Sequence, residues 1–367
     1  MTQPRPRPAR LVTPAQVWSG GGVLAAAGEG VLEVASRIGC VAGNRAWEAI
    51  GPALIRDWGA FGIEVIRLEP GSGTLAHVER LAGEAREARV GAVLGCGGGV
   101  VLDTAKLVAH RAGLPGIALP GVVSCGAAWT RAADLLDEAG AWSRRVLLPA
   151  PPEVVILDLA LLRATTPRMI AAALAGAPVE LEIPLDPSMP LARTAAATVA
   201  ALRGTLRRVG LEAVRAARQG HHPEAWGQAV EAVIHFSGLA AMVLGPERPA
   251  SIAQAVARAL SAVPGVASSL YGERLAFGAV VQALLAADDE LPALELVGHH
   301  AQLGLPLALR ALGSSDDPRR ISALARRIAD LTSWELDPLR LAEAVQHADA
   351  LGKVASACRP ITFPGTP

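Results

Sequence analysis

The sequence predicts an α/β domain built on a parallel sheet, followed by an all-α domain. In the first half of the 367 residues, short β-branched runs alternate with helical stretches. One of these runs leads directly into a cluster of glycines. After residue 165 the β-rich runs almost disappear. We therefore expect domains at residues 1–165 and 166–367, with residues 1–9 as a flexible tail.

Five short apolar runs in the first half predict strands, because each is bounded by turn-forming or charged residues. Between them lie stretches with helical periodicity, and in the first of these Ile50, Leu54 and Trp58 share one face. Such short alternating units favour parallel strands with helices on both faces of the sheet. The predicted strands are residues 39–42, 63–68, 90–94, 116–119 and 154–157, and the predicted helices are residues 46–59, 75–87 and 103–112.

The second half is predicted to be helical from residue 166 onward. Thr166 can cap a helix, and Pro167 suits its first position, where the missing N–H costs nothing. The predicted helices are residues 171–175, 191–209, 211–218, 223–241, 251–263, 272–288, 293–303, 317–332 and 337–356.

Composition argues against several classes of protein. The 34 basic and 34 acidic residues balance, which removes the electrostatic argument for binding nucleic acid or an anionic membrane. The longest uncharged run, residues 112–130, contains Pro115 and Pro120 and is not typical of a membrane helix. The four cysteines form no CxxC pair, and the N-terminus lacks the apolar stretch of a signal peptide. We expect a soluble, cytoplasmic protein with reduced thiols.

The sharpest local feature is the glycine cluster at residues 95–99, which lies between a predicted strand and a predicted helix. Gly97, Gly98 and Gly99 let backbone N–H groups approach an anion, and the following helix adds unpaired N–H groups and the positive end of its dipole. This arrangement suits pyrophosphate binding, although tight turns also use glycines. Asp103 and Lys106 follow on one side of the helix, and Lys106 is one of only two lysines in the chain.

In this loop and in several other segments the sequence resembles the glycerol dehydrogenase and iron-containing alcohol dehydrogenase family. GCGGGVVLDTAK resembles the family's GGGxxxDxAK phosphate loop. Residues 117–131 resemble the PTxxSTDA segment beside the nicotinamide, and residues 152–175 resemble the junction between the two domains. SGL at 237–239, GERLAFG at 272–278 and LGLPLAL at 303–309 resemble motifs of its helical domain. The resemblance spans about residues 10–350 in unbroken order.

The resemblance implies a Rossmann-like dinucleotide-binding domain, a helical domain as in dehydroquinate synthases, and an active site in the cleft between them. It assigns to cofactor binding the residues Gly97, Gly98, Gly99, Asp103, Lys106, Pro120, Gly121 and Ser124, and, beside the adenosine ribose, Gly43, Asn44 and Arg45. No carboxylate stands at this ribose position, and Arg45 can pair with a 2′-phosphate. We therefore expect NADP(H) in preference to NAD(H).

The positions that hold a divalent metal in the family carry other residues here. The family uses one Asp and two His, and the resemblance places Gly176, Gln254 and Tyr271 at these positions. None is a good ligand for Zn²⁺ or Fe²⁺. The histidine pairs at 221–222 and 299–300 lack the spacing of helical ligand pairs. We expect no catalytic metal.

Hydride transfer without a metal needs another source of charge stabilisation and of a proton. Tyr271, the only tyrosine, can donate a proton, Gln254 can orient it or the substrate, and Arg258 can contribute charge. An iminium substrate already carries the charge that a metal would induce, so an imine or activated ketone fits this site better than an alcohol. Residues expected to shape the substrate pocket are Gly126, Trp129, Arg131 and Gly176.

Other functions stay open at this point. The same ligand losses suit a non-catalytic nucleotide-binding protein that descends from a dehydrogenase. A metal-dependent, glycerol-like alcohol dehydrogenase and a cyclase like the dehydroquinate synthases are further alternatives. The partners that we expect are a small-molecule substrate and further copies of the chain in a homodimer or larger homo-oligomer, with no nucleic acid and no membrane.

Overall fold

The computed structural model describes residues 11–69, 71–181, 191–245, 250–332 and 334–357. The chain forms two compact units, Met1–Arg248 and Pro249–Pro367. The predicted flexible tail, residues 1–9, lies outside the described residues. The change from α/β to helical structure occurs at Pro167, where α6 begins. The helices that follow cluster with the sheet up to Arg248, and the domain boundary near residue 165 stays a prediction.

The first unit contains a six-stranded parallel sheet in the order β1-β8-β5-β4-β2-β3. This confirms the predicted parallel α/β fold. All five predicted strands are present, within one to three residues at each end. The strands are β1 (Gln16–Gly20), β2 (Arg37–Ala42), β3 (Glu64–Leu68), β4 (Ala92–Gly97), β5 (Gly116–Pro120) and β8 (Val154–Asp158).

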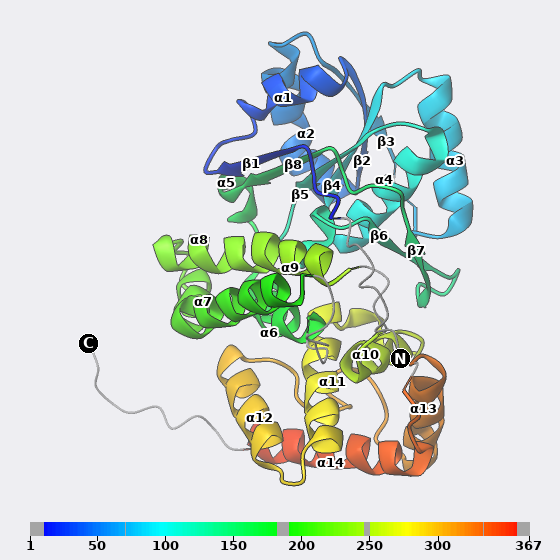
Figure 1. The fold of residues 1–367 in the computed structure, drawn as a ribbon, viewed down its shortest axis with the longest axis vertical. Helices are drawn as coiled ribbons and strands as arrows, with labels where there is room; N and C mark the ends of the chain where they lie inside the picture. The colour runs from blue at the N-terminus through cyan, green and yellow to red at the C-terminus, as the bar shows by residue number, and fades with distance from the viewer. Residues whose placement is uncertain (1–10, 70, 182–190, 246–249, 333, 358–367) are drawn as a thin grey trace, which may run out of the picture. The chain divides into compact units, whose positions relative to one another are not determined.

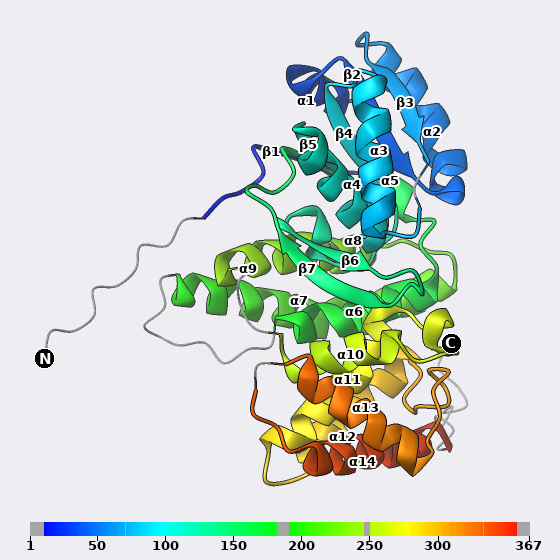
Figure 2. The same cartoon turned by 90° about the vertical axis from the view of Figure 1, so that its right-hand side faces the viewer.

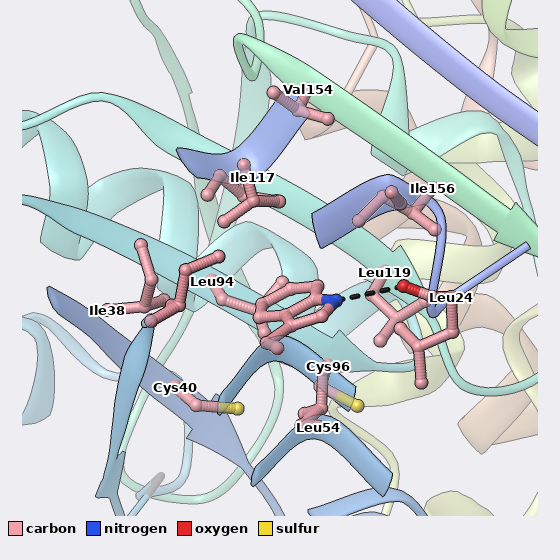
Figure 3. Packing of buried hydrophobic residues seen from close by; sticks show 14 of the residues in the cluster. Leu24, Ile38, Cys40, Leu54, Leu94, Cys96, Ile117, Leu119, Val154 and Ile156 are labelled. Atoms are coloured by element: carbon pink, nitrogen blue, oxygen red, sulfur yellow. Dashed lines mark hydrogen bonds between the residues drawn. The ribbon is translucent and has the colours of Figure 1, made fainter. Parts of the chain in front are cut away.

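Helices cover both faces of this sheet (Figures 1 and 2). Because side chains alternate along a strand, Cys40 and Leu94 point to one face, whereas Val41 and Val93 point to the other. The first face packs against α1 (Ala27–Val34) and α2 (Asn44–Gly59), and the second against α3 (Leu75–Glu87) and α4 (Gly99–Ala112). Figure 3 shows the first of these two cores.

Several elements of the first unit were not predicted. The strand β1 has the sequence QVWSG, with no apolar run, and α1 contains two glycines. The antiparallel strands β6 (Ala132–Leu136) and β7 (Trp142–Leu147) have the sequences AADLL and WSRRVL, which contain no run of apolar β-branched residues. Asp134 and Arg145 are partners across this pair, and Arg145 donates two hydrogen bonds to the carboxylate at 2.9 and 3.0 Å.

The rest of the first unit is helical. The two predicted helices at 191–209 and 211–218 are one helix, since Gly210 is buried within α7 and does not interrupt it. The predicted helix at 223–241 is divided by a π-helical turn, η2 (Ala232–Phe236). The helices are α5 (Leu159–Leu162), α6 (Pro167–Glu180), α7 (Ala192–Arg218), α8 (Glu224–Glu231) and α9 (Ser237–Leu244).

The second unit consists of helices in its described part, as predicted. They are α10 (Ile252–Ser261), α11 (Tyr271–Ala286), α12 (Leu291–Leu303), α13 (Pro318–Asp330) and α14 (Pro338–Ala357). The helices α10 and α11 approach each other closely at Gly278. A Cβ added there would lie only 2.6 Å from the carbonyl oxygen of Ala253. Glycine at 278 therefore sets the distance between these two helices.

One helical stretch among the described residues, Glu224–Leu244, is long and apolar enough to cross a membrane by composition alone. Of its most apolar window, 61% is buried inside the fold. Burial of this extent is typical of a core helix of a globular domain.

Asp158 at the end of β8 connects three segments of the first unit. Its buried carboxylate accepts hydrogen bonds from the backbone N–H groups of Gly22 (2.8 Å), Leu24 (2.9 Å) and Ala160 (2.8 Å). It thereby caps α5 and fixes the turn that leads into α1. The indole N–H of Trp58 binds the carbonyl of Leu24 at 2.9 Å and holds the same turn from the other side.

We expect Asp158→Ala to lower the free energy of unfolding by about 3 kcal/mol, because it leaves three backbone N–H groups without their acceptor. Asp158→Asn keeps one acceptor oxygen and is expected to lose less. Urea unfolding followed by circular dichroism measures both. Equal stability of Asp158→Ala and the wild type would show that this carboxylate does not hold the turn.

Candidate functional site

The glycine cluster lies at the carboxyl end of β4. Gly98 is the N-cap of α4, and the helix begins at Gly99, four residues before the predicted start. No side chain caps this end of the helix. The first N–H groups of a helix have no intrahelical acceptor, and here no side chain takes their place. Unpaired N–H groups at a helix N-terminus are suited to bind an anion.

The segment after β5 packs directly on this glycine cluster. The N–H of Gly121 donates to the carbonyl of Gly97 at 2.9 Å. A Cβ added at Gly98 would lie 3.3 Å from Val122, and one at Gly99 would lie 3.4 Å from Sγ of Cys125. The structure therefore brings together the predicted residues of the phosphate loop and those of the segment that begins at Pro120.

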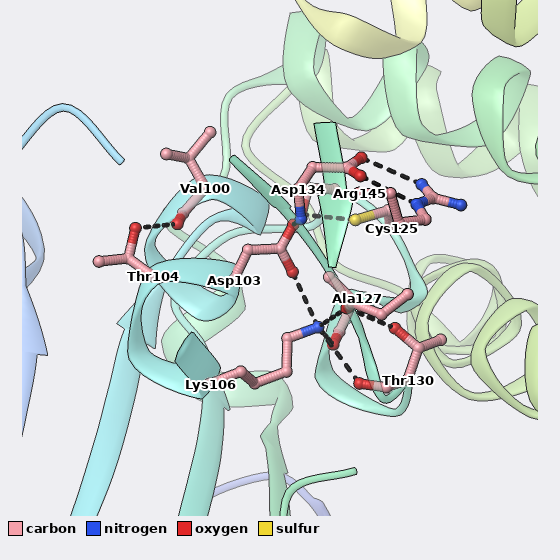
Figure 4. A network of polar contacts seen from close by, with 11 residues as sticks. Val100, Asp103, Thr104, Lys106, Cys125, Ala127, Thr130, Asp134 and Arg145 are labelled. Carbon is pink, nitrogen blue, oxygen red and sulfur yellow. Dashed lines mark hydrogen bonds and ion pairs between the residues drawn. The ribbon is translucent and has the colours of Figure 1, made fainter. Parts of the chain in front are cut away.

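Lys106 is buried and bound to protein atoms (Figure 4). Its ammonium forms an ion pair with Asp103 at 2.8 Å. It also donates to the carbonyls of Ala127 at 3.0 Å and Thr130 at 3.2 Å, and to that of Ala132. An ammonium has three N–H donors, so these contacts saturate it. Lys106 connects α4 to residues 127–132.

Asp103 completes this connection. One of its oxygens accepts the N–H of Asp134 at 3.1 Å, which fixes the first residues of β6. Burial raises the pKa of Asp103, whereas the adjacent Lys106 ammonium lowers it, and the Asp134 carboxylate raises it further. The Asp103–Lys106 pair therefore holds in place the segment that lies on the glycine cluster.

The predicted ribose-binding residues lie at the carboxyl end of β2, beside β4. Gly43 is the N-cap of α2, and Arg45 is exposed. Sequence analysis missed Arg67 on β3, which donates a hydrogen bond to the side chain of Asn44 and lies 5.6 Å from the ring centre of Trp47. A guanidinium on an adjacent strand was not visible from the motif, because β3 pairs with β2 only in the folded sheet.

Two residues predicted for the substrate pocket contact other parts of the protein, and their role in a pocket stays a prediction. A Cβ added at Gly126 would lie 2.5 Å from the backbone nitrogen of Gly238 on α9, so glycine allows the close approach of these segments. Arg131 donates to the carbonyl of Leu148 at 3.1 Å. Gly176 is buried within α6, and Ser124 is half-buried beside Cys125.

Trp129 contacts a histidine that sequence analysis missed. Its indole N–H donates to Nδ1 of His235 at 3.0 Å, and the two rings meet edge to face at 80°. Burial lowers the pKa of His235 to about 4. His235 lies in η2, and its contact with Trp129 could not be predicted because the periodicity of the sequence does not predict a π-helical turn.

The three predicted catalytic residues lie on α10 and α11 of the second unit. Gln254 is buried and forms a capping box: its Oε1 accepts the N–H of Ser251 at 3.0 Å, while the Ser251 hydroxyl accepts the N–H of Gln254 at 3.2 Å. Within the described residues its Nε2 has no hydrogen-bond partner. Arg258 is buried one turn later on the same helix.

Tyr271 is the first residue of α11 and is half-buried. Arg274, one turn further along this helix, was not predicted to belong to the site. Burial lowers the pKa of Arg274, while interaction with Tyr271 and Glu273 raises it. Arg274 donates to the carbonyl of Ser269 at 2.8 Å and so stays close to the start of α11.

The side chains at the three expected ligand positions do not suit a divalent metal. Gly176 offers no donor, Gln254 already uses its amide oxygen in the capping box, and Tyr271 offers a phenol. Among the described residues no group of three or more His, Cys, Asp or Glu could hold a metal ion. A glycine, an amide and a phenol are not the carboxylate and imidazole ligands that Zn²⁺ and Fe²⁺ prefer, and the absence of a catalytic metal stays a prediction.

Comparisons with known proteins agree on one family. A family profile described as "Iron-containing alcohol dehydrogenase" matches residues 22–166. A glycerol dehydrogenase of Escherichia coli O6:H1 is 31% identical over 284 residues, which cover 74% of this chain and 75% of that protein.

Solved structures share the fold. A probable glycerol dehydrogenase from Sinorhizobium meliloti 1021 has a TM-score of 0.83 at 21% identity and covers 94% of this chain and 99% of its own. Glycerol dehydrogenase from Schizosaccharomyces pombe has the same TM-score, 0.83, at 20% identity and covers 96% and 93%. At such identities these likenesses support the fold alone.

We expect Lys106→Met to lower the free energy of unfolding by about 3 kcal/mol, because it leaves the Asp103 carboxylate buried without its cation. The double variant with Asp103→Asn should lose about 1–3 kcal/mol less than the sum of the two single losses. Urea unfolding of all four proteins gives this coupling.

An exposed ion pair provides the control. Arg37 pairs with Glu64 across β2 and β3, and both side chains are about half exposed, so Arg37→Met should cost under about 1 kcal/mol. Additive losses from Asp103→Asn and Lys106→Met would contradict the account of a coupled pair.

Proposed function

Because the chain belongs to the iron-containing alcohol dehydrogenase and glycerol dehydrogenase family, and is an oxidoreductase of that family, we propose a more specific function for it. It reduces an imine or ketone of a small molecule with NAD(P)H and without a catalytic metal. The observation that carries this proposal is that the three expected metal-ligand positions hold Gly176, Gln254 and Tyr271, which provide neither a carboxylate nor an imidazole.

The glycine cluster supports binding of the cofactor's pyrophosphate. The N–H groups of the first turn of α4 are directed at the carboxyl edge of the sheet, where α/β proteins bind nucleotides. Lys106 acts on the cofactor through the loop that it holds, since its N–H groups already bind protein atoms.

The ribose end favours NADP(H) over NAD(H) in this proposal. Arg45 is exposed, and within the described residues it has no ion pair that would compete with a phosphate. Asn44 binds Arg67 and offers no carboxylate to repel a 2′-phosphate. A guanidinium beside a helix N-terminus is suited to a phosphate monoester.

The proposed chemistry assigns the proton to Tyr271. A bound reduced nicotinamide supplies the hydride. The Tyr271 phenol donates a proton to the acceptor, Gln254 orients the phenol or the substrate through its Nε2, and Arg258 stabilises negative charge. An imine substrate lowers the demand on these residues, because its protonated form is already cationic.

Two alternatives rest on separate observations. The same donor set suits a protein that binds nucleotide without turnover. A metal-dependent alcohol dehydrogenase acting on a glycerol-like substrate is favoured by the likeness to the E. coli glycerol dehydrogenase. In either case we propose a cytoplasmic homodimer or larger homo-oligomer.

Calorimetric titration of chelator-treated protein tests the cofactor. We expect micromolar binding of NADPH, at least about tenfold tighter than NADH, which corresponds to about 1.4 kcal/mol from a charged contact. Arg45→Ala should abolish this preference and leave NADH binding unchanged. Arg56→Ala, on the same helix and paired with Asp57, is the control and should bind as the wild type does. No binding of either nucleotide to any of these proteins would contradict the proposed function.

Tyr271→Phe tests the proton donor. With a cyclic imine as acceptor, we expect turnover to fall by about 10²–10³-fold, as for loss of a general acid. The nucleotide affinity should not change, because Tyr271 is not assigned to the cofactor. Wild-type turnover in Tyr271→Phe would remove this residue from the mechanism.

A further inference from the structure

His235 is held at both ring nitrogens. Nδ1 accepts the indole N–H of Trp129 at 3.0 Å, and Nε2 lies 3.0 Å from the hydroxyl oxygen of Ser19. An indole N–H can only donate, so Nδ1 carries no proton. In the neutral ring the proton is therefore on Nε2, which donates to Ser19. Burial lowers the pKa of His235 to about 4, so this tautomer is present at neutral pH.

An irregular stretch of helix backbone places His235 in contact with Trp129. The π-helical turn η2 interrupts the regular helix and changes the direction of the side chains that follow. The hydroxyl of Ser237 donates to the carbonyl of Val233, which satisfies one acceptor of this turn. A π-helical turn is rare in helices and is found frequently at functional sites.

Glycine lets the Trp129 side chain lie on the backbone of α9. A Cβ added at Gly238 would lie 2.5 Å from Cβ and Cγ of Trp129. The indole is therefore fixed by a helix backbone beneath it and by His235 at its edge. Its one polar group is used by His235, so the half-buried ring offers only apolar surface to a ligand.

Trp129 belongs to the segment that packs on the glycine cluster. Cys125 of this segment lies against Gly99, and Lys106 binds the carbonyls of Ala127 and Thr130 on either side of the tryptophan. The same segment thus carries a rigid apolar ring near the loop assigned to the cofactor. Ser19, at the carboxyl end of β1, marks the same edge of the sheet.

We propose that Trp129 determines specificity by binding an apolar group of the substrate, and that His235 is the residue that positions Trp129. This inference rests on the proposed function. It names the substrate class as an acceptor that carries an apolar substituent next to its C=N or C=O group. Trp129 makes the contact, whereas His235 acts only through Trp129.

Binding of two matched probes tests this proposal without relying on turnover. The probes are 2-methyl-1-pyrroline and 2-phenyl-1-pyrroline, titrated by calorimetry into protein saturated with NADP⁺. We expect the phenyl compound to bind at least about tenfold tighter to the wild type, from burial of its ring. Trp129→Ala should reduce this ratio to about twofold or less, whereas Trp129→Phe should keep part of it.

The histidine variants separate positioning from general stability. His235→Phe removes the acceptor and should lower the binding ratio, whereas His235→Gln supplies an amide oxygen and should restore it. The control is His222→Phe, since His222 meets Trp226 edge to face in the same helical region. It should leave the ratio unchanged.

A ratio that survives Trp129→Ala, or that falls equally in His235→Phe and His222→Phe, would overturn the proposal, as would a wild type that does not discriminate. If His235→Phe does not fold, nitrogen–proton spectra of the wild type replace it. The indole signal absent in Trp129→Phe should then be protected from solvent exchange; rapid exchange would overturn the proposal. Trp129-dependent binding with no reduction of either probe would contradict only the proposed reaction.

Discussion

The buried ion pair between Asp103 and Lys106 is the interaction on which the candidate site depends. It connects the first turns of α4 to residues 127–132 and, through the N–H of Asp134, to β6. The loop that would receive a pyrophosphate, the carbonyls around Trp129 and the start of the β6–β7 pair are thus fixed by one cation. Burying two charges costs desolvation energy. That cost is offset only where the two charges are well placed and further hydrogen bonds satisfy their remaining donors and acceptors.

Most of the fold of the first unit was predictable because its strands and helices carry strong periodic patterns. The strands β2, β4 and β8 are continuous apolar runs, as expected for a parallel sheet covered on both faces. The elements that sequence analysis missed depend on tertiary contacts. β1 is a strand because it pairs with β8, and β6 and β7 are stabilised by Asp134 and Arg145 across the pair. The pattern of apolar and polar residues along one strand does not show which distant strand or side chain it will contact.

The candidate site was predictable to a smaller extent. The motif located the glycine cluster, and its packing against the segment after Pro120 follows from the adjacent strands β4 and β5. The resemblance assigned Lys106 to cofactor binding, which stays a prediction, whereas its contacts with the carbonyls of Ala127 and Thr130 are visible only in the folded chain. Arg67, His235 and Arg274 were missed because each acquires its partner from a distant segment or from a helical irregularity. Spacing along the sequence identifies residues of one element, whereas a site is assembled from several.

We propose that this family member works without a metal. Metal analysis of the protein purified from zinc- and iron-supplemented cells, followed by NADPH oxidation with a cyclic imine before and after chelation, tests it most directly. We expect far less than one metal ion per chain and the same turnover after chelation. One tightly bound ion per chain, together with turnover that chelation abolishes and Zn²⁺ or Fe²⁺ restores, would contradict it.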